Sequence, residues 1–600
     1  MHIKIATFLI QQHRLLAPRN NCRAFAPSFT LKMRLLQVLC LLPLAAAFGS
    51  SWYHNAFPWQ KPLSGSTVNG VHFPSLLDAD LEDLAAGLEK GLFTSVDLVT
   101  AYTRRILEVN STLKAVTQLN PDALAIAAEL DAARSSGAVK GPLHGIPILL
   151  KDNIATADKM DNTAGSYALV GAKVPEDSTV AAKLRKAGAI ILGKTNLSEW
   201  ANSRSKNYTS GWSATGGQTE GAYYPQQDPS GSSSGSGVAI ALGLALASLG
   251  TETHGSILAP SDANNLVGIK PSVGLTSRYL VVPISEHQDT VGPMARTVKD
   301  AAYLLSAIVG RDPNDNYTSA IPFPTDQPPN YVSACDYFAL RGARIGVPRN
   351  LIELDDQSFA PILPAFEKAL STLRSAGATI IDDLVLSGYE TLKKENFSFE
   401  SIVMNTDFPR NLASYFSQLT INPHNILSLK DVERFTHSDP REEWPLKDTL
   451  AWDRAFNVSS TTSDAEAWGN YTALQRYAGG AEGLFGTLRR HSLDAMVLPT
   501  LWSTTLPAVL GSPVVSVPMG KYPEDARKLK NGYGNQWLVA PGVPFGLAFM
   551  GERFSEKRLI GLAYAYEQRT KVRGQVRPYL VPRTEVGDVV VGKGKGKGGL

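Results

Sequence analysis

Short apolar runs alternate with helical patterns of apolar residues along most of the chain. A helix is predicted from residue 95, because Thr94 and Asp97 have the spacing of a capping box and apolar residues recur every three or four positions after them. Strands are predicted at 146–150, 189–192, 344–347, 378–381, 495–498, 514–517 and 545–549, and further helices at 180–187, 359–376 and 556–568. This alternation predicts an α/β fold.

Two regions depart from the alternation of strands and helices. Residues 385–475 are less regular and rich in aromatic side chains, so we interpret them as an elaboration that caps a site. Residues 586–600 end in a Gly-Lys repeat of low complexity, which predicts a disordered tail.

The N-terminal segment determines the charge balance of the chain. Residues 1–47 carry six basic groups and no acid, and without them the formal charge changes from +3 to −3. A basic stretch at 32–34, an apolar run at 35–44 and three alanines at 45–47 fit a secretory signal peptide with Met33 as the expected initiator. We therefore expect secretion, with a mitochondrial presequence as the alternative. The near-neutral remainder gives no electrostatic reason for a nucleic-acid partner, and the apolar run is too short to span a membrane.

Glycosylation sequons and the cysteine count also favour secretion. Sequons begin at Asn110, Asn207, Asn316, Asn396, Asn457 and Asn470. A further sequon at Asn196 lies in a motif that we expect to be buried. Removal of residues 1–47 leaves Cys335 as the one cysteine of the sequence, so a large core must stabilise the fold without an internal disulfide. These features predict a secreted glycoprotein.

Residues 229–237 form an unusual run of small residues that reads PSGSSSGSG. A flexible linker is one interpretation, but residues 238–249 are apolar on every side and predict a buried helix. A phosphate-binding loop is excluded because no Gly-Lys-Ser/Thr follows. A small-residue loop that opens a buried helix favours close approach of the backbone to a reacting group.

The stretch GTETHGSI at 250–257 is a second candidate site segment. Gly255 permits backbone conformations that other residues avoid, so successive N–H groups here could form an oxyanion hole. An ordinary Gly-Ser turn is the alternative. His254 precedes Gly255-Ser256, but neighbours in sequence rarely form a Ser–His catalytic pair. The ten histidines include no His-x-x-x-His pair with a nearby acid, so no metal site is predicted.

Lys151 ends the predicted strand at 146–150. A lysine in such a position usually extends its amine to solvent. If the amine is buried instead, its pKa falls and the neutral form can accept a proton from a serine.

These three segments, in this order, resemble the amidase signature family. The family pattern is Lys-Asp at a strand end, then Gly-Ser-Ser-Gly, then Gly-Ser-Ile. Ser232 and Ser256 are 24 positions apart, which is the family spacing. The similarity runs from about 75 to 585 and includes the stretches at 193–196, 268–274, 292–296 and 563–568. Within the family, the stretches at 196–202, 210–213 and 216–218 are most similar to the peptide amidase branch.

The resemblance implies a single α/β/α domain over 75–585, with a large twisted mixed sheet covered by helices on both sides. It implies a Ser-Ser-Lys triad of Lys151, Ser232 and Ser256, with a cis peptide bond before Ser232. The residues implied at the oxyanion and substrate site are Thr253, His254, Gly255 and Ala201. The chemistry implied needs no cofactor and no metal.

The function implied is hydrolysis of a carboxylic or peptide-like amide to an acid and ammonia through an acyl-enzyme. One alternative is an amidotransferase subunit that releases ammonia for tRNA-linked glutamate. The other is a non-catalytic binding protein on an amidase scaffold. His254 stands where most relatives have Gly or Asp, and Leu258 where carboxylate-handling members often have Arg. The resemblance therefore does not specify which amide is cleaved, and neither it nor the composition specifies an oligomeric state.

Overall fold

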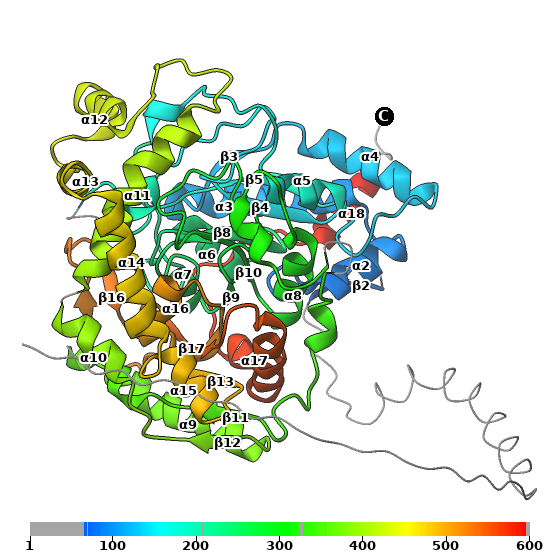
Figure 1. Cartoon of the computed structure of the whole chain (residues 1–600). Helices are drawn as coiled ribbons and strands as arrows, with labels where there is room; N and C mark the ends of the chain where they lie inside the picture. Colours follow the sequence, from blue (N-terminus) through cyan, green and yellow to red (C-terminus); the bar gives the residue numbers. More distant parts are fainter. Residues whose placement is uncertain are drawn as a thin grey trace, which may run out of the picture. The chain divides into compact units, whose positions relative to one another are not determined.

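The apolar runs of the sequence form most of one large sheet at the centre of the fold (Figure 1). The computed structural model describes residues 65–595, apart from 69, 206–208, 325–327, 354–355 and 396. The strands of this sheet are β3 (Val116–Leu119), β4 (Pro147–Lys151), β5 (Ile190–Thr195), β8 (Ala247–Glu252), β9 (Val267–Lys270), β10 (Thr290–Ala295), β11 (Arg344–Gly346), β12 (Thr379–Ile381), β13 (Ala495–Pro499), β14 (Val514–Lys521) and β17 (Pro544–Met550). All seven predicted strands are present within a residue or a few of their expected bounds.

The sheet has eleven strands of mixed direction, in the order β12-β11-β13-β17-β14-β9-β10-β8-β4-β5-β3. Strand β4 lies between β5 and β8 and runs parallel to both, with Ile148 opposite Ile191 and Leu149 opposite Ser248. The carboxyl ends of β4 and β8 therefore meet at the same edge of the sheet, which is where ligands bind in many open α/β sheets. This order confirms the predicted α/β class with a mixed sheet.

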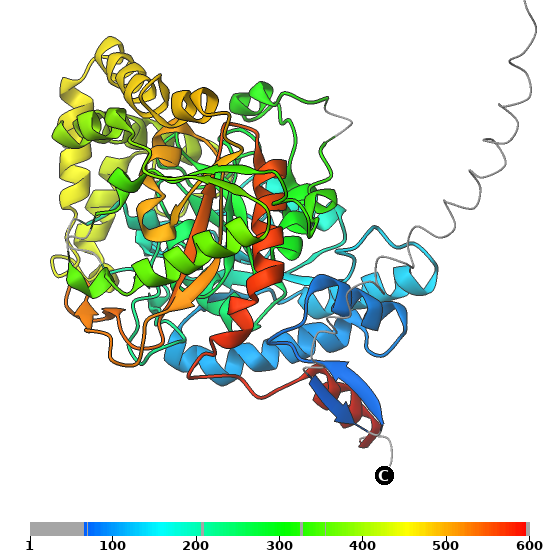
Figure 2. The same cartoon turned by 90° about the horizontal axis from the view of Figure 1, so that it is seen from below.

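Helices lie on both sides of the strands (Figures 1 and 2). They are α2 (Leu81–Glu89), α3 (Ser95–Leu113), α4 (Ala123–Ser135), α5 (Thr179–Lys186), α6 (Ser234–Ala241), α7 (Leu258–Ala263), α8 (Val298–Ile308), α9 (Ile362–Ser375), α15 (Leu484–Arg490), α16 (Thr505–Leu510) and α17 (Glu556–Thr570). Helix α3 begins with the predicted capping box, in which Thr94 and Asp97 bond each other's backbone N–H. Within the described residues, no helix has both the length and the apolar content that crossing a membrane requires.

The helix expected over 238–249 is wrong in its second half. Helix α6 ends at Ala241, and the chain turns at Gly243 into strand β8. Gly243 has φ +61°, and a Cβ atom there would lie 2.2 Å from the carbonyl oxygen of Leu76, so only glycine fits this turn. A continuous apolar run does not distinguish a buried helix from a buried strand by its periodicity, which is why the sequence pattern misses the change.

Residues 385–475 are mainly helical and lie along the left side of Figure 1. Their helices are α10 (Ser387–Lys394), α11 (Ser398–Phe416), α12 (Leu429–Ser438), α13 (Leu450–Thr461) and α14 (Asp464–Gly479). We call this part of the chain the helical segment. Its apolar side chains form a second buried cluster, in which Phe416 and Trp452 each meet the ring of Trp200 edge to face at 6.4 Å.

The first and last described segments pack against each other (Figure 2). Strands β1 (Gly65–Val68) and β2 (Val71–Pro74) form a hairpin, and helix α18 (Val586–Lys595) lies on it and on α3. The tail expected to be disordered from 586 is therefore helical up to 595, because Val586 and Val589 share a face and are buried. The compact unit also begins ahead of residue 75, since it includes the hairpin. The predicted signal peptide at 1–47 and residues 596–600 lie outside the described residues.

Candidate functional site

Lys151 is the last residue of β4 and is fully buried. Its Nζ atom lies 2.7 Å from the hydroxyl oxygen of Ser232, 2.8 Å from Oγ1 of Thr251 and 3.1 Å from the Thr251 carbonyl oxygen. Burial lowers the pKa of Lys151 to about 7, although the charges of Asp289 and Glu252 oppose this shift. The amine therefore does not extend to solvent, and a large fraction of it is neutral at physiological pH.

Ser232 lies in the small-residue loop just before α6 and is fully buried. The peptide bond between Gly231 and Ser232 is cis, as the family resemblance implies. The Ser232 carbonyl accepts a hydrogen bond from the Ser198 N–H at 3.1 Å. A Cβ atom on Gly231 would lie 2.5 Å from the Ser198 hydroxyl, so the close approach of these two segments requires glycine. The run that resembles a flexible linker is thus a tightly packed turn.

Ser256 follows strand β8 and lies beside the Ser232 loop. Its carbonyl oxygen accepts a hydrogen bond from the Ser233 N–H at 3.2 Å, and the residue is 6% exposed. Lys151, Ser232 and Ser256 are therefore brought together at the edge of the sheet where β4 and β8 end. Of the three residues, Ser256 alone is slightly exposed, whereas Lys151 and Ser232 are fully buried.

The backbone between β8 and α7 has the character of an anion site. Gly255 has φ +76°, which turns the chain, and within the described ranges the N–H groups of His254, Gly255 and Ser256 donate to no protein acceptor. The next two N–H groups, of Ile257 and Leu258, both donate to the Glu252 carboxylate, at 2.8 and 3.0 Å. Three consecutive N–H groups thus remain available for an external anion.

Thr253 is held at the start of this loop by its hydroxyl group. Thr253 Oγ1 donates to Asp289 Oδ1 at 2.5 Å, and Asp289 is itself fixed by the Ile284 N–H at 2.8 Å. Beside it, Thr251 Oγ1 also accepts a hydrogen bond from the side chain of Asn153 at 3.0 Å. Thr251 lies within the predicted stretch 250–257 and Asn153 lies two positions after Lys151, but the sequence assigns neither a role, and Asp289 belongs to no motif of the sequence.

His254 joins this loop to the helical segment. Its Nδ1 atom lies 2.9 Å from Glu400 Oε1 on α11, and its Nε2 atom lies 3.3 Å from the Thr505 hydroxyl. Burial alone lowers the pKa of His254, but the Glu400 carboxylate outweighs burial and raises it above the ordinary value. About a third of the His254 side chain is exposed (34%), so the ring borders solvent and the candidate oxyanion site together.

Ala201 lies in a stretch of unusual backbone. Trp200, Ala201 and Asn202 have φ values of +48°, +52° and +72°, so three successive residues adopt left-handed conformations. Ala201 lines a cavity of about 20 Å³, room for about one water molecule, together with Thr251 and Thr253. Ala201 therefore lies near Thr251, which contacts Lys151, whereas Trp200 is buried in the apolar cluster under the helical segment.

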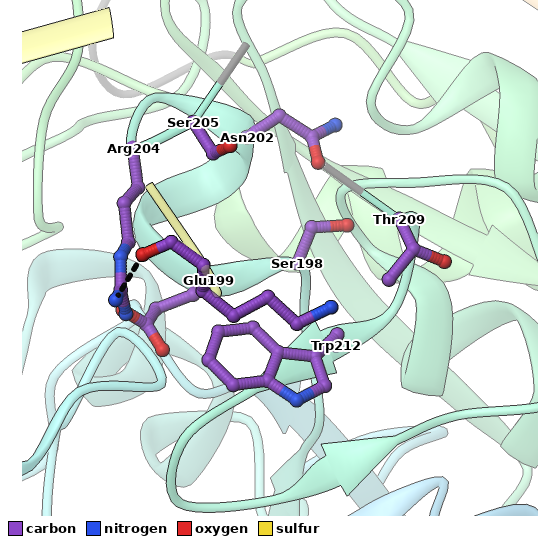
Figure 3. A pocket seen from close by; sticks show the side chains of 8 residues that line it. Ser198, Glu199, Asn202, Arg204, Ser205, Thr209 and Trp212 are labelled. Carbon is purple, nitrogen blue, oxygen red and sulfur yellow. Dashed lines mark hydrogen bonds and ion pairs between the residues drawn. The ribbon is translucent and has the colours of Figure 1, made fainter. Parts of the chain in front are cut away.

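A second pocket is lined by Trp212 and seven other residues. They are Ser198, Glu199, Asn202, Arg204, Ser205, Thr209 and Lys447 (Figure 3). The Lys447 Nζ atom lies 4.9 Å from the centre of the Trp212 ring and 4.1 Å from that of Tyr533, in cation–π geometry. Since the Ser198 N–H bonds the Ser232 carbonyl, this pocket adjoins the loop that carries Ser232.

Glu199 has a structural role in the wall of this pocket. Arg204 Nη1 donates to Glu199 Oε1 at 2.5 Å, drawn as a dashed line in Figure 3, and to Glu442 Oε2 at 3.0 Å. All three side chains are buried, and Glu442 belongs to the helical segment. Leu258 is fully buried in an apolar cluster with Leu498 and other side chains.

Comparison with known proteins identifies relatives over most of the chain. The family model described as Amidase matches residues 97–507. The chain is similar to a putative amidase of Arthroderma benhamiae, with 47% identity over 91% of this chain and 95% of that protein. It is also similar to a probable amidase of Arabidopsis thaliana, with 38% identity over 83% and 91% of the two chains. Among solved structures, native peptide amidase from Stenotrophomonas maltophilia is 39% identical over 85% of this chain and 99% of its own, with a TM-score of 0.73.

Proposed function

The chain belongs to the amidase family, and on that premise we propose that it hydrolyses a peptide-like or other carboxylic amide to an acid and ammonia. The observation that carries this proposal is the contact of 2.7 Å between Lys151 Nζ and Ser232 Oγ, made by an amine whose pKa is about 7. A buried amine that is partly neutral at physiological pH is a general base, and its partner is a hydroxyl group next to a second serine.

The proposed acylation step moves one proton along these three residues. Neutral Lys151 accepts the proton of Ser232, and Ser232 accepts the proton of Ser256 as the Ser256 oxygen attacks the amide carbonyl carbon. The negative charge that develops on the carbonyl oxygen is received by the N–H groups of His254, Gly255 and Ser256. Each such donor contributes about 2.7–4 kcal/mol of transition-state stabilisation in well-studied hydrolases.

The proposed second half releases the two products. The proton returns through Ser232 to the amide nitrogen, the C–N bond breaks, and ammonia leaves an ester on Ser256. Water, deprotonated through the same relay, then attacks the ester and frees the acid and the serine. Lys151 and Ser232 relay each proton in this sequence, and the backbone N–H groups only donate hydrogen bonds to the oxyanion.

The peptide-like substrate is supported by the kind of relative. The peptide amidase of Stenotrophomonas maltophilia shares 39% of its residues with this chain. The pocket lined by Trp212 and Lys447 adds no support, because it measures about 20 Å³, room for about one water molecule, and Lys447 is buried against the rings of Trp212 and Tyr533. Trp200 belongs to the core.

An ammonia-release assay on a panel of amides tests the proposal. The substrates are a C-terminally amidated dipeptide, a simple aliphatic amide, a long-chain fatty amide and glutamine, and the Ser256→Ala variant is the control. We expect ammonia from the dipeptide amide with the wild type alone. Turnover of the fatty amide alone would reject the peptide-like substrate, and ammonia from glutamine alone would favour the amidotransferase alternative. No turnover, together with no labelling by a fluorophosphonate, would favour a binding protein.

A further inference from the structure

Helix α11 carries two carboxylates, spaced two helical turns apart, that contact the stretch after β8 and the stretch before β10. Glu400 Oε1 lies 2.9 Å from Nδ1 of His254, and Asp407 Oδ2 lies 2.7 Å from Nδ1 of His287. Both carboxylates are largely buried, with side chains 9% and 10% exposed. The helical segment thus contacts these two stretches through two histidine–carboxylate pairs. One of the histidines, His254, belongs to residues 253–256, which we call the oxyanion loop.

Glu400 reaches the oxyanion loop by a second route as well. The Gln288 side-chain amide donates to Glu400 Oε1 at 3.2 Å and to the carbonyl oxygen of Thr253 at 3.4 Å. One carboxylate oxygen therefore fixes His254 directly and Thr253 through Gln288. These two residues immediately precede Gly255, whose open backbone has no side chain to hold it.

The Asp407 contact fixes the segment behind this loop. Asp407 accepts a hydrogen bond from the Ser285 hydroxyl at 2.5 Å, and the Ser285 carbonyl accepts one from the Asp289 N–H at 2.9 Å. Asp289 in turn holds the Thr253 hydroxyl. Every side-chain support of Thr253 and His254 described above, apart from the Thr505 contact, thus leads back to α11.

We propose that Glu400 is a positioning residue of the reaction: through His254 it holds the N–H groups of residues 254–256 in the orientation that receives the oxyanion. This inference rests on the proposed function of Ser256 as nucleophile. The Glu400 carboxylate touches no reacting atom, so its effect passes through the loop. The helical segment is then a part of the catalytic apparatus and more than a cover over it.

Because the His254–Glu400 pair is charged, the contribution of Glu400 to kcat should depend on pH. The charged groups that face His254 are Glu400 on α11, Glu252 at the end of β8 and Lys270 on β9. The two carboxylates keep His254 protonated to a higher pH than a free histidine, and His254 in turn outweighs burial and keeps the pKa of Glu400 low. An imidazolium beside the oxyanion loop favours the negative charge of the transition state, and this benefit is lost as the pH rises through the raised pKa of His254.

Four variants of the full chain test the inference, with kcat, KM and the pH profile as readouts. Glu400→Ala removes the contact, Glu400→Gln retains the shape without the charge, and His254→Asn removes the ring. Arg410→Ala is the matched control, because Arg410 lies on the same helix in an exposed ion pair with Asp464. Thermal unfolding of each variant reports whether the fold is retained.

We expect Glu400→Ala and His254→Asn to lower kcat by about 10- to 100-fold, with KM changed less than about twofold. The reason is that a displaced oxyanion loop stabilises the transition state less but leaves substrate binding nearly unchanged. Glu400→Gln should restore part of kcat and move the alkaline limb of the profile to lower pH. Arg410→Ala should match the wild type.

Wild-type kcat in Glu400→Ala, or an alkaline limb that does not move in Glu400→Gln, would overturn the inference. If Glu400→Ala fails to fold, the isosteric Glu400→Gln and its pH profile decide the matter. Failure of the underlying function has a different signature, because the wild type would then show no Ser256-dependent hydrolysis at any pH.

Discussion

The amine of Lys151 ends a strand whose five residues are all buried, and its hydrogen-bond partners are hydroxyl and carbonyl oxygens. A carboxylate partner at this distance would hold the lysine in its charged form and raise its pKa. Asp289 and Glu252 act on Lys151 only through their charge and do not cancel the effect of burial. The position of the residue at the end of β4 therefore favours the neutral amine, which is the form that the proposed proton relay requires.

Replacement of Lys151 tests this base directly. We expect Lys151→Ala to lower kcat/KM by about three orders of magnitude or more, because the variant retains no amine that can accept the Ser232 proton. In the wild type, kcat/KM should rise with pH through an apparent pKa of about 7, since the neutral amine is the active form. A profile that is flat from pH 5 to 9, with chemistry rate-limiting, would exclude a titrating lysine.

Replacement of Ser256 tests whether this residue is the nucleophile. Ser256→Ala should abolish covalent labelling by a fluorophosphonate and leave the unfolding temperature within a few degrees of the wild type, because the deleted hydroxyl makes no described contact that holds the fold. Intact mass spectrometry measures the label. Ser135→Ala is the control, since Ser135 is an exposed serine on α4 whose hydroxyl bonds only the Asp131 carbonyl of its own helix. Labelling that persists in Ser256→Ala would place the nucleophile elsewhere.

At the scale of elements, the helical segment is joined to the stretch after β5 by a buried ionic contact as well as by apolar packing. The Arg204 guanidinium contacts both Glu199 and Glu442, and its Nη2 also donates to the carbonyl oxygens of Glu442 and Lys447 at 2.6 and 2.8 Å. These contacts bring residues 442–447 against the wall of the Trp212 pocket. Removal of the cation deprives both buried carboxyl groups of their ion-pair partner.

We therefore expect Arg204→Met to be strongly destabilising. Loss of one partner from a buried ion pair typically costs about 3–5 kcal/mol, because the remaining charges stay buried and uncompensated. Urea unfolding of the wild type and variant measures the difference. Arg441→Met is the matched control, since Arg441 pairs with Asp439 at the surface and should leave the unfolding midpoint close to that of the wild type. Equal midpoints for Arg204→Met and the wild type would refute this role.

The same contacts show what the sequence can and cannot predict. Lys151, Ser232 and Ser256 belong to short motifs that can be recognised in the sequence alone, and the strands around them are continuous apolar runs. Glu400 lies 146 positions from His254 and Glu442 lies 238 from Arg204, so no local pattern connects either pair. The helix in place of the expected disorder at 586–595 has the same origin, because only packing against the hairpin orders that segment.

At the scale of the whole molecule, the surface offers sites for modification that the interior does not. Asn457 is exposed on α13, whereas Asn196 is fully buried, with its amide nitrogen bonded to the carbonyls of Gly211 and Gly217. The sequons at Asn207 and Asn396 lie outside the described residues. We propose that the protein is secreted after removal of residues 1–47 and is glycosylated at exposed sequons only.

Protein recovered from the medium of a secreting host should begin near residue 48 and carry a glycan at Asn457. N-terminal sequencing locates the first residue, and peptide mass spectrometry before and after glycosidase treatment locates the glycans. Asn457→Gln should remove one glycan, and the Asn196 peptide should be unmodified in the same sample as an internal control. An unglycosylated protein found in mitochondria would contradict the proposal.

The packing of α18 on the β1–β2 hairpin allows the order of the elements along the chain to be changed by circular permutation. The Glu585 carboxylate accepts hydrogen bonds from the Leu76 N–H at 2.7 Å and the Ser75 hydroxyl at 3.2 Å, so the two ends of the described chain are neighbours. A short glycine-serine linker from α18 to β1 should therefore yield a circular permutant, with new termini opened in the exposed loop at 423–425. In that molecule α12, α13 and α14 would begin the chain and α10 and α11 would end it, so the helical segment would be divided between the two termini while the strands of the large sheet form one continuous stretch between them.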